Sequence, residues 1–187
     1  MILKSLKIDS TWTLFLDRDG VINKRIEGDY IRSWLQFEFI PGTEEAFHVF
    51  SEIFGHVIVV SNQQGIGKGL MSDSDVQGIH NRMIHEIQKG NGRIDKVYYS
   101  PFLDSENSIQ RKPNIGMALK ARKDFPEIRF KKSVMAGDSI SDMIFGKRLK
   151  MKTVFVGTNR KLILQGPMLI DYVYPDLLTF ANDLSAK

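Results

Sequence analysis

The chain has 187 residues and a mass of 21.4 kDa, a size that suits one globular domain. Hydrophobic residues make up 42% and charged residues 26%, which excludes a chain that is disordered, collagen-like or coiled-coil throughout. The 26 basic and 22 acidic residues give a net charge of +4, which fits an anionic small molecule as well as nucleic acid. Because the chain has no cysteine, disulfides, zinc–thiolate sites, iron–sulfur clusters and thiol nucleophiles are excluded.

Neither a membrane span nor a signal peptide is evident. No apolar run approaches the roughly 20 residues that a spanning helix needs. The N-terminus mixes charges into its apolar positions and lacks the apolar centre of a signal peptide. We therefore expect a cytoplasmic protein with no membrane partner, folded as one domain over residues 1–187.

Short apolar runs alternate with helical patterns along the chain. The runs at 14–16, 57–60, 133–136 and 153–156, with a weaker one at 97–99, predict strands buried on both faces of a sheet. Helices are predicted after a Thr43 cap, after a capping box of Ser72 and Asp75, and over the ranges 115–122, 139–149 and 177–184. This alternation predicts an α/β fold with a doubly wound, Rossmann-like parallel sheet. The stretch 21–40 lacks periodicity, and we expect it to form an irregular flap near the site.

Acidic clusters follow two of the predicted strands. Asp17 and Asp19 come directly after the first strand, where an alternating backbone would place both carboxylates on one side. Asp138 and Asp142 follow another strand, and their spacing of four would put them on one face of a helix. Their mutual repulsion predicts a bound cation, and the oxygen-only ligands favour Mg²⁺. The structural alternatives are a turn at the first cluster and a helix cap at Asp138.

Two further polar segments are placed to bind an anion. Ser61 and Asn62 follow the second strand, where a hydroxyl and backbone amides at a helix entrance would cradle a phosphate. Arg111, Lys112 and Pro113 precede the third predicted helix; Pro113 suits a first turn that would hold Lys112 at the helix entrance. The alternatives are a simple loop and ordinary solvated surface. The glycine-rich stretch 65–69 lacks the Gly-Lys-Ser/Thr ending of a Walker motif, so nucleoside triphosphate hydrolysis of that type is excluded.

Taken in order, these motifs resemble the haloacid dehalogenase superfamily of phosphatases. The stretches 17–23, 61–66 and 111–113 look like its histidinol-phosphate and heptose-bisphosphate phosphatase branch, and the motif-bearing core spans about 12–157. The resemblance implies a doubly wound sheet with the first motif on a central strand and no large cap domain. It also implies a Mg²⁺-dependent phosphatase that works through an aspartyl-phosphate.

Roles for individual residues follow from the same resemblance. Asp17 would be the nucleophile, and Asp19 would protonate the leaving oxygen and then activate water. Mg²⁺ would be held by Asp17, the Asp19 backbone carbonyl and Asp138, with Asp142 close to the ion without binding it directly. Ser61, Asn62 and the catalytic Lys112 would hold the transferring phosphoryl group. The planar fork of Arg111 suits a second phosphate or a sugar hydroxyl further out.

One departure from the branch bears on metal and substrate. Members of this branch usually carry a zinc loop of Cys and His before the Arg-Lys-Pro motif, whereas residues 99–110 contain neither, so we expect no zinc. The four histidines, His80 and His85 among them, are expected to be packing or surface residues.

We expect a monomer acting on a small phosphorylated metabolite. The leading candidate is D-glycero-D-manno-heptose 1,7-bisphosphate, cleaved at its 7-phosphate, and histidinol phosphate is the alternative. A polynucleotide 3′-phosphatase is disfavoured because no concentrated basic stripe is present, and no nucleic-acid partner is expected. A non-catalytic, receiver-like module with a similar acidic pocket would differ by its lack of turnover.

Overall fold

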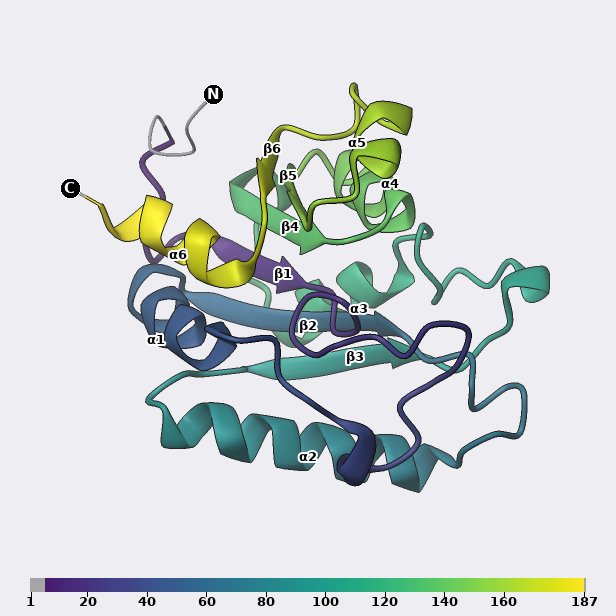
Figure 1. Ribbon diagram of the computed structural model, residues 1–187. Helices are drawn as coiled ribbons and strands as arrows, with labels where there is room; N and C mark the ends of the chain where they lie inside the picture. The colour runs from purple at the N-terminus through teal and green to yellow at the C-terminus, as the bar shows by residue number, and fades with distance from the viewer. Residues whose placement is uncertain (1–5, 187) are drawn as a thin grey trace.

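The computed structural model describes residues 6–186 and has a six-stranded sheet at its centre (Figure 1). All neighbouring strands are parallel, in the order β3-β2-β1-β4-β5-β6. The predicted doubly wound α/β fold is confirmed, with the strand that precedes Asp17 at the centre. The short edge strand β6 was not predicted. The strands are β1 (Thr13–Leu16), β2 (His56–Asn62), β3 (Lys96–Ser100), β4 (Ser133–Gly137), β5 (Lys152–Val156) and β6 (Tyr172–Tyr174).

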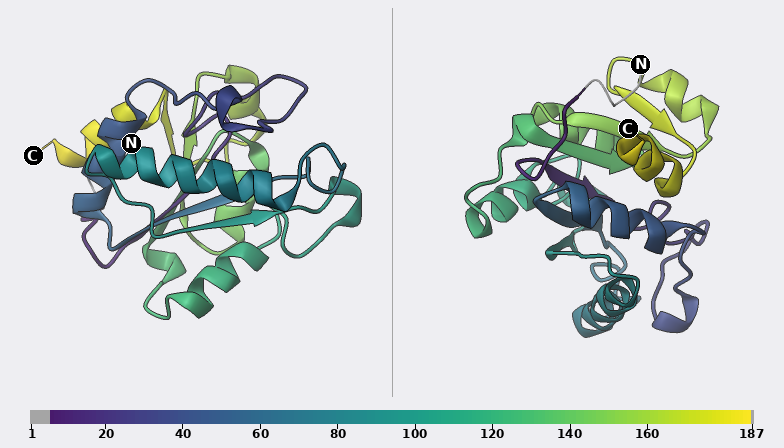
Figure 2. Two further views of the ribbon diagram at one scale, coloured as in Figure 1. Left: turned by 90° about the horizontal axis from the view of Figure 1, so that it is seen from below. Right: turned by 90° about the vertical axis from the view of Figure 1, so that its left-hand side faces the viewer.

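Helices connect the strands and cover both faces of the sheet (Figure 2). They are α1 (Thr43–Ile53), α2 (Asp73–Lys89), α3 (Gly116–Asp124), α4 (Ile140–Arg148), α5 (Arg160–Gln165) and α6 (Leu177–Ser185), with short 3₁₀ turns η2 (Trp34–Gln36), η3 (Asp104–Glu106) and η4 (Phe130–Lys132). Helix α5 was not predicted. The predicted capping box at the start of α2 is present: the Ser72 hydroxyl accepts from the Asp75 amide at 3.1 Å, and the Ser72 amide donates to the Asp75 carboxylate at 2.8 Å.

The strands are continuous apolar runs because alternate side chains enter two separate cores. In β1, Leu14 and Leu16 pack in the core formed with α1, α2 and α6, whereas Phe15 packs in the core formed with α3 and α4. All three side chains are fully buried. Burial on both faces is typical of parallel sheets, and it fixes the direction in which each strand end projects its polar residues.

Two details of the predicted helices are wrong. The residue that caps α1 is Gly42, at a φ of +82°, whereas Thr43 is the first helical residue and its hydroxyl donates to the Ile22 carbonyl at 3.2 Å. The apolar pattern predicts a buried stripe of Ile115, Ala118, Leu119 and Arg122 on α3. The stripe that is buried includes Met117 and Ala121 beside Ala118, whereas Leu119 is 45% exposed. Short helices carry too few turns for the apolar pattern to fix the buried face.

The flap over residues 21–40 is irregular apart from η2, as predicted. It extends beyond the carboxyl ends of β1 and β2 (Figure 1). Trp34 anchors it, stacking on Phe37 with ring centroids 4.7 Å apart and lying under the Arg82 guanidinium of α2 at 5.2 Å. The flap is therefore held against α2 while its other side faces the polar strand ends.

Candidate active site

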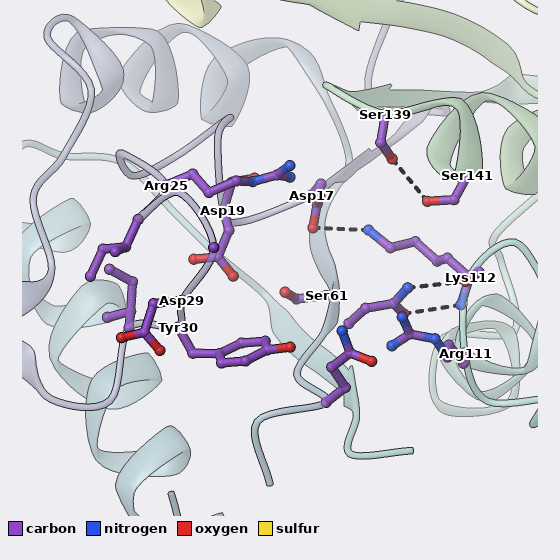
Figure 3. Close-up of a pocket in the computed structure, with 15 residues that line it drawn as sticks. Asp17, Asp19, Arg25, Asp29, Tyr30, Ser61, Arg111, Lys112, Ser139 and Ser141 are labelled. Atoms are coloured by element: carbon purple, nitrogen blue, oxygen red, sulfur yellow. Dashed lines mark hydrogen bonds and ion pairs between the residues drawn. The ribbon is translucent and has the colours of Figure 1, made fainter. Parts of the chain in front are cut away.

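A cavity of about 400 Å³ opens at the carboxyl edge of the sheet (Figure 3). Ligand sites of doubly wound sheets lie at this edge, and the volume suits a small metabolite. The structure brings six of the predicted site residues to its wall, and the flap supplies much of the remainder. The predicted residues are Asp17, Asp19, Ser61, Asn62, Arg111 and Lys112, and flap residues that join them include Arg25, Asp29 and Tyr30.

Three carboxylates gather beside this cavity. Asp17, Asp138 and Asp142 each offer an oxygen, and these oxygens lie within 4.8 Å of one another. Two glycines make the approach possible. A Cβ at Gly20, which has a φ of +88°, would lie 2.0 Å from an Asp138 oxygen, and a Cβ at Gly137 would lie 2.4 Å from Asp142. The two acidic motifs thus pack against each other, because they follow the neighbouring strands β1 and β4.

Lys112 is the internal counter-ion of this cluster. Its Nζ lies 2.9 Å from Asp17 Oδ1 and 2.7 Å from Asp142 Oδ1, and it donates to the Val60 carbonyl at 2.7 Å. Burial alone would lower the pKa of Lys112, but the charges of Asp142 and Asp17 outweigh it and raise the pKa. Its side chain is 1% exposed, so the alternative of solvated surface is wrong.

The predicted helix entrances are absent from the two segments that were predicted to bind phosphate. Ser61 and Asn62 are the last residues of β2, and α2 begins only at Asp73. Pro113 precedes α3 instead of occupying its first turn. Asn62 positions Lys112 directly: its Oδ1 accepts from the Lys112 amide and its Nδ2 donates to the Lys112 carbonyl, both at 3.0 Å. The Asn62 side-chain amide therefore holds Lys112 in place, a role that was predicted for the start of a helix.

The cap of α4 is Ser139, so the interpretation of Asp138 as a helix cap is wrong. The Ser139 amide donates to Asp142 Oδ2 at 3.1 Å, and the Ser139 hydroxyl accepts from the Asp142 amide at 3.3 Å. Asp142 is in the first turn and fully buried, with its other oxygen toward Lys112. Asp138 precedes the helix, and its carboxylate lies against Arg25 and beside Asp17.

Crowding of these carboxylates disfavours their ionised forms. Burial, together with repulsion from Asp142 and Asp19, raises the pKa of Asp17 to about 6, although Lys112 opposes the shift. Burial and repulsion from Asp17 raise the pKa of Asp138 to about 7, although Arg25 opposes it. Each carboxylate would be stabilised by a further positive charge, which is the condition for binding a divalent cation.

Arg25, from the flap, was not predicted. It donates to Asp138 Oδ1 at 2.9 Å and to the backbone carbonyl of Asp19 at 3.0 Å. These are two of the oxygens to which the resemblance assigns Mg²⁺. No local sequence signal marks Arg25, because its partners lie 113 residues away and in the backbone. Because the positively charged Arg25 side chain binds both of these oxygens, the oxygens form a donor set that fits a hard metal ion.

Asp19 lies on the cavity wall and is held by three side chains. Arg18 and Asn23 donate to its Oδ1 at 2.9 and 3.0 Å, and Gln63 donates to its Oδ2 at 2.8 Å. Burial alone would raise the pKa of Asp19, but the charge and hydrogen bonds of Arg18, with those of Asn23 and Gln63, lower it. Arg18, Asn23 and Gln63 were not predicted as site residues.

The segment before Lys112 is closed by hydrogen bonds. Arg111 donates from Nε to Asp104 Oδ1 and from Nη1 to the Phe102 carbonyl, both at 3.2 Å, and Asn114 donates to the Ser108 carbonyl at 3.1 Å. Within residues 6–186, the acidic trio is the one His/Cys/Asp/Glu grouping with metal-ligand proximity. Arg111 thus contacts the cavity while also holding the loop together.

Comparisons with known proteins agree with this geometry. The HAD-hydrolase-like family matches residues 109–180. The D-glycero-alpha-D-manno-heptose-1,7-bisphosphate 7-phosphatase of Mycobacterium bovis is 40% identical over 132 residues, 71% of this chain and 70% of its own. The enzyme of the same name from Campylobacter jejuni is 36% identical over 151 residues, 81% of this chain and 85% of its own.

The solved structures give the same result. The D,D-heptose 1,7-bisphosphate phosphatase of B. bronchiseptica, complexed with magnesium and phosphate, superposes with a TM-score of 0.84 at 25% identity. The match covers 92% of this chain and 97% of that protein. Identity and coverage at these levels, together with the strand-end carboxylates, show that this chain is a phosphatase of the haloacid dehalogenase-like hydrolases and belongs to their heptose-bisphosphate phosphatase branch.

Proposed function

We propose that this phosphatase removes the 7-phosphate of D-glycero-D-manno-heptose 1,7-bisphosphate, using Mg²⁺ and an aspartyl-phosphate intermediate. The observation that carries the proposal is the position of Asp17. Its carboxylate lines a cavity of metabolite size, beside the Lys112 ammonium and next to Asp138. A carboxylate at such a strand end is held rigidly enough to attack a phosphorus atom in line.

Asp17 and Asp19 divide the reaction between them. In the first step an Asp17 oxygen bonds to phosphorus, the sugar C–O–P bridge breaks at phosphorus, and the leaving alkoxide takes a proton from Asp19. This step requires the acid form of Asp19, although Arg18, Asn23 and Gln63 lower its pKa. In the second step Asp19 takes a proton from water, whose oxygen attacks phosphorus and releases Asp17 and phosphate. Lys112, Ser61 and Asn62 surround the phosphoryl group, where fixed donors stabilise its developing charge.

Asp17, Asp138 and the Asp19 carbonyl are the groups that would hold Mg²⁺, with Asp142 supporting Lys112 behind them. When bound, the ion supplies positive charge that offsets repulsion between the carboxylates and the phosphate. We propose no zinc site. Elemental analysis of protein purified without added metal checks this; stoichiometric zinc would contradict it.

The second phosphate is the basis for preferring a bisphosphate. Arg111 lines the cavity one residue before Lys112, and its guanidinium offers more donors than its two loop contacts use. The relatives from M. bovis and C. jejuni are both named for the α-anomer of the bisphosphate, which makes that anomer the substrate to test first.

Steady-state phosphate release tests the proposal. We expect Mg²⁺-dependent turnover of the α-heptose 1,7-bisphosphate with a kcat/KM well above those for heptose 7-phosphate and histidinol phosphate. Arg111→Ala should raise KM more for the bisphosphate than for the monophosphate. Preference for histidinol phosphate, or equal effects of Arg111→Ala on both sugars, would contradict the assignment. If none of the three substrates is turned over repeatedly, the chain is not an enzyme that acts on these substrates.

The organisation of the chain is part of the proposal. We propose that residues 1–187 form one phosphatase domain that acts as a monomer in the cytoplasm, without nucleic-acid or membrane partners. All six strands between residues 6 and 186 join a single sheet, which supports one domain. None of the helices in that range combines the length and apolar character needed to cross a bilayer. Light scattering coupled to gel filtration measures the oligomeric state directly.

A further inference from the structure

Arg18 is a fully buried arginine that the proposed reaction does not use. It lies between the two catalytic aspartates in sequence, and its exposed fraction is 0%. A buried guanidinium is costly unless its donors are paired, because it carries a full charge out of water. Its partners therefore reveal what holds it in place.

Three side chains surround the Arg18 guanidinium. Its Nη2 lies 2.9 and 3.0 Å from the two Asp19 oxygens, and its Nε lies 3.2 Å from Asp19 Oδ1. Gln63 Oε1 accepts from Nη2 at 3.2 Å. On the far side, Nη1 lies 2.9 Å from Nε2 of His80 on α2.

The chemistry of Arg18 fixes the state of His80. A guanidinium only donates, so His80 Nε2 must accept, and the imidazole is neutral with its proton on Nδ1. Burial, with the positive charge of Arg18, lowers the pKa of His80 to about 3, although Asp19 opposes the shift. His80 is 4% exposed and packs against the Tyr99 ring at 5.2 Å. The imidazole is thus a rigid acceptor supplied by the helix.

The same arrangement restricts Asp19 from several directions. Gln63 connects the Arg18 guanidinium to the Asp19 carboxylate, because its Oε1 accepts from Arg18 while its Nε2 donates to Asp19 Oδ2 at 2.8 Å. Asn23 donates to Oδ1 from the start of the flap at 3.0 Å. Since the residue after β2, the start of the flap and Arg18, itself held by α2, each contribute a group, the Asp19 carboxylate has one orientation at the cavity wall. A displacement of about 1 Å in a catalytic group costs on the order of a hundredfold in rate.

We propose that His80 is a positioning residue for the reaction: acting through Arg18, it fixes the orientation in which Asp19 delivers a proton to the leaving oxygen. The inference rests on the acid–base role of Asp19 in the proposed function. It gives the buried face of α2 a role beyond packing. Of the residues in this arrangement, Asp19 is the one that lines the cavity.

Leaving-group dependence separates positioning from simple loss of structure. Phenyl phosphate and 4-nitrophenyl phosphate have nearly the same shape, but only the phenolate of the first needs protonation to leave readily. We compare kcat/KM, which reports the steps through phosphoryl transfer to Asp17. His80→Leu removes the acceptor, and His80→Gln restores an oxygen at the distance of Nε2. His80→Asn is polar but too short to reach Arg18, and it replaces His80→Leu if that variant does not fold.

We expect His80→Leu to lower kcat/KM for phenyl phosphate by about tenfold and for 4-nitrophenyl phosphate by less than about threefold. The tenfold loss is smaller than the full contribution of general acid catalysis, about 10²–10⁴, because Asp19 itself remains. His80→Gln should recover most of the difference. Equal losses on both substrates, no loss, or failure of His80→Gln to recover selectivity would overturn the proposal.

Asp19→Asn distinguishes this inference from the proposed function. It should lower kcat/KM for phenyl phosphate by about 10², and again by much less for 4-nitrophenyl phosphate. If Asp19→Asn is selective and the His80 variants are not, only the positioning proposal fails. If Asp19→Asn lowers both substrates alike, the acid role of Asp19 is wrong, and the positioning proposal is overturned with it.

Discussion

Replacing Lys112 tests how the acidic cluster is stabilised. Its Nζ lies within 2.9 Å of one oxygen of Asp17 and within 2.7 Å of one of Asp142, and the side chain is 1% exposed. Lys112→Met keeps the apolar stem and leaves two buried carboxylates without their counter-ion. Removing one partner of a buried ion pair costs about 3–5 kcal/mol, so we expect the free energy of unfolding to fall by about 4 kcal/mol. Activity should fall by about 10²–10³ in kcat.

Urea denaturation in metal-free buffer measures the stability change. The matched control is Lys161→Met on the exposed surface of α5, which should stay within about 0.5 kcal/mol of wild type. Adding Asp142→Asn to Lys112→Met removes one unpaired charge and should restore about 2 kcal/mol, whereas Asp142→Asn alone should destabilise. Additive effects of the two substitutions, or a Lys112→Met variant as stable as the control, would refute the counter-ion role.

The pH dependence of the same variant has a defined sign. Burial raises the pKa of Asp17 to about 6 even with Lys112 present. Without Lys112, the pKa of Asp17 in the folded protein rises further above that of an unfolded aspartate, near 3.9. The folded state then binds more protons than the unfolded state, so stability falls as pH rises through this window. The deficit of Lys112→Met relative to wild type should therefore be smaller at pH 5 than at pH 8. A deficit that does not change with pH would show that the lost contacts are not those of ionised carboxylates.

Three further predictions concern the nucleophile and the metal. Asp17→Asn should lower kcat by at least about 10³ with an unchanged circular dichroism spectrum, and near-normal turnover would rule out an aspartyl-phosphate at this position. Mg²⁺ affinity, measured by calorimetry, should fall as pH drops through 7 toward 6, because Asp138, with a pKa of about 7, and Asp17, with a pKa of about 6, must lose protons to bind the ion; an affinity that is flat from pH 8 to 6 would contradict this. Arg25→Met should tighten Mg²⁺ binding by about tenfold, or about 1.4 kcal/mol, by removing a cation that shares its oxygens; weaker binding would instead make Arg25 part of the metal site.

The strands were predictable because burial on both faces leaves an unambiguous sequence signal. Val57–Val60 and Thr153–Val156 are continuous apolar runs, and the structure places both inside the sheet. The edge strand β6 has only three residues, with Val173 45% exposed, so no periodicity marks it. Strand β6 exists because it forms hydrogen bonds with β5, and the sequence of residues 172–174 alone does not indicate that partner.

The site residues also differ in how far the sequence could predict them. Asp17 and Asp138 directly follow buried strands and Ser61 lies at the carboxyl end of one, and the topology of a parallel sheet carries such ends to one edge, so all three were predicted. Arg25 and His80 were not predicted as site residues. Arg25 lies in a flap without periodicity. The sequence predicts His80 to be a packing or surface residue, and its contact with Arg18 joins residues 62 positions apart. A side chain that contributes through a distant partner has no local motif.

The two cations beside the carboxylates differ in a way that bears on how the site is assembled. The Lys112 side chain is 1% exposed and bonded to a strand carbonyl as well as to two aspartates, so it belongs to the folded core and has no aqueous route of exit. The Arg25 side chain is 52% exposed and reaches Asp138 from a flap, so its release exposes the charge to water at little desolvation cost. We therefore expect a divalent cation at the proposed Mg²⁺ site to displace Arg25 but not Lys112. Binding of the ion to Asp138 and the Asp19 carbonyl should then free Arg25 within a cavity whose proposed substrate is anionic, so that flap position and metal occupancy would be coupled.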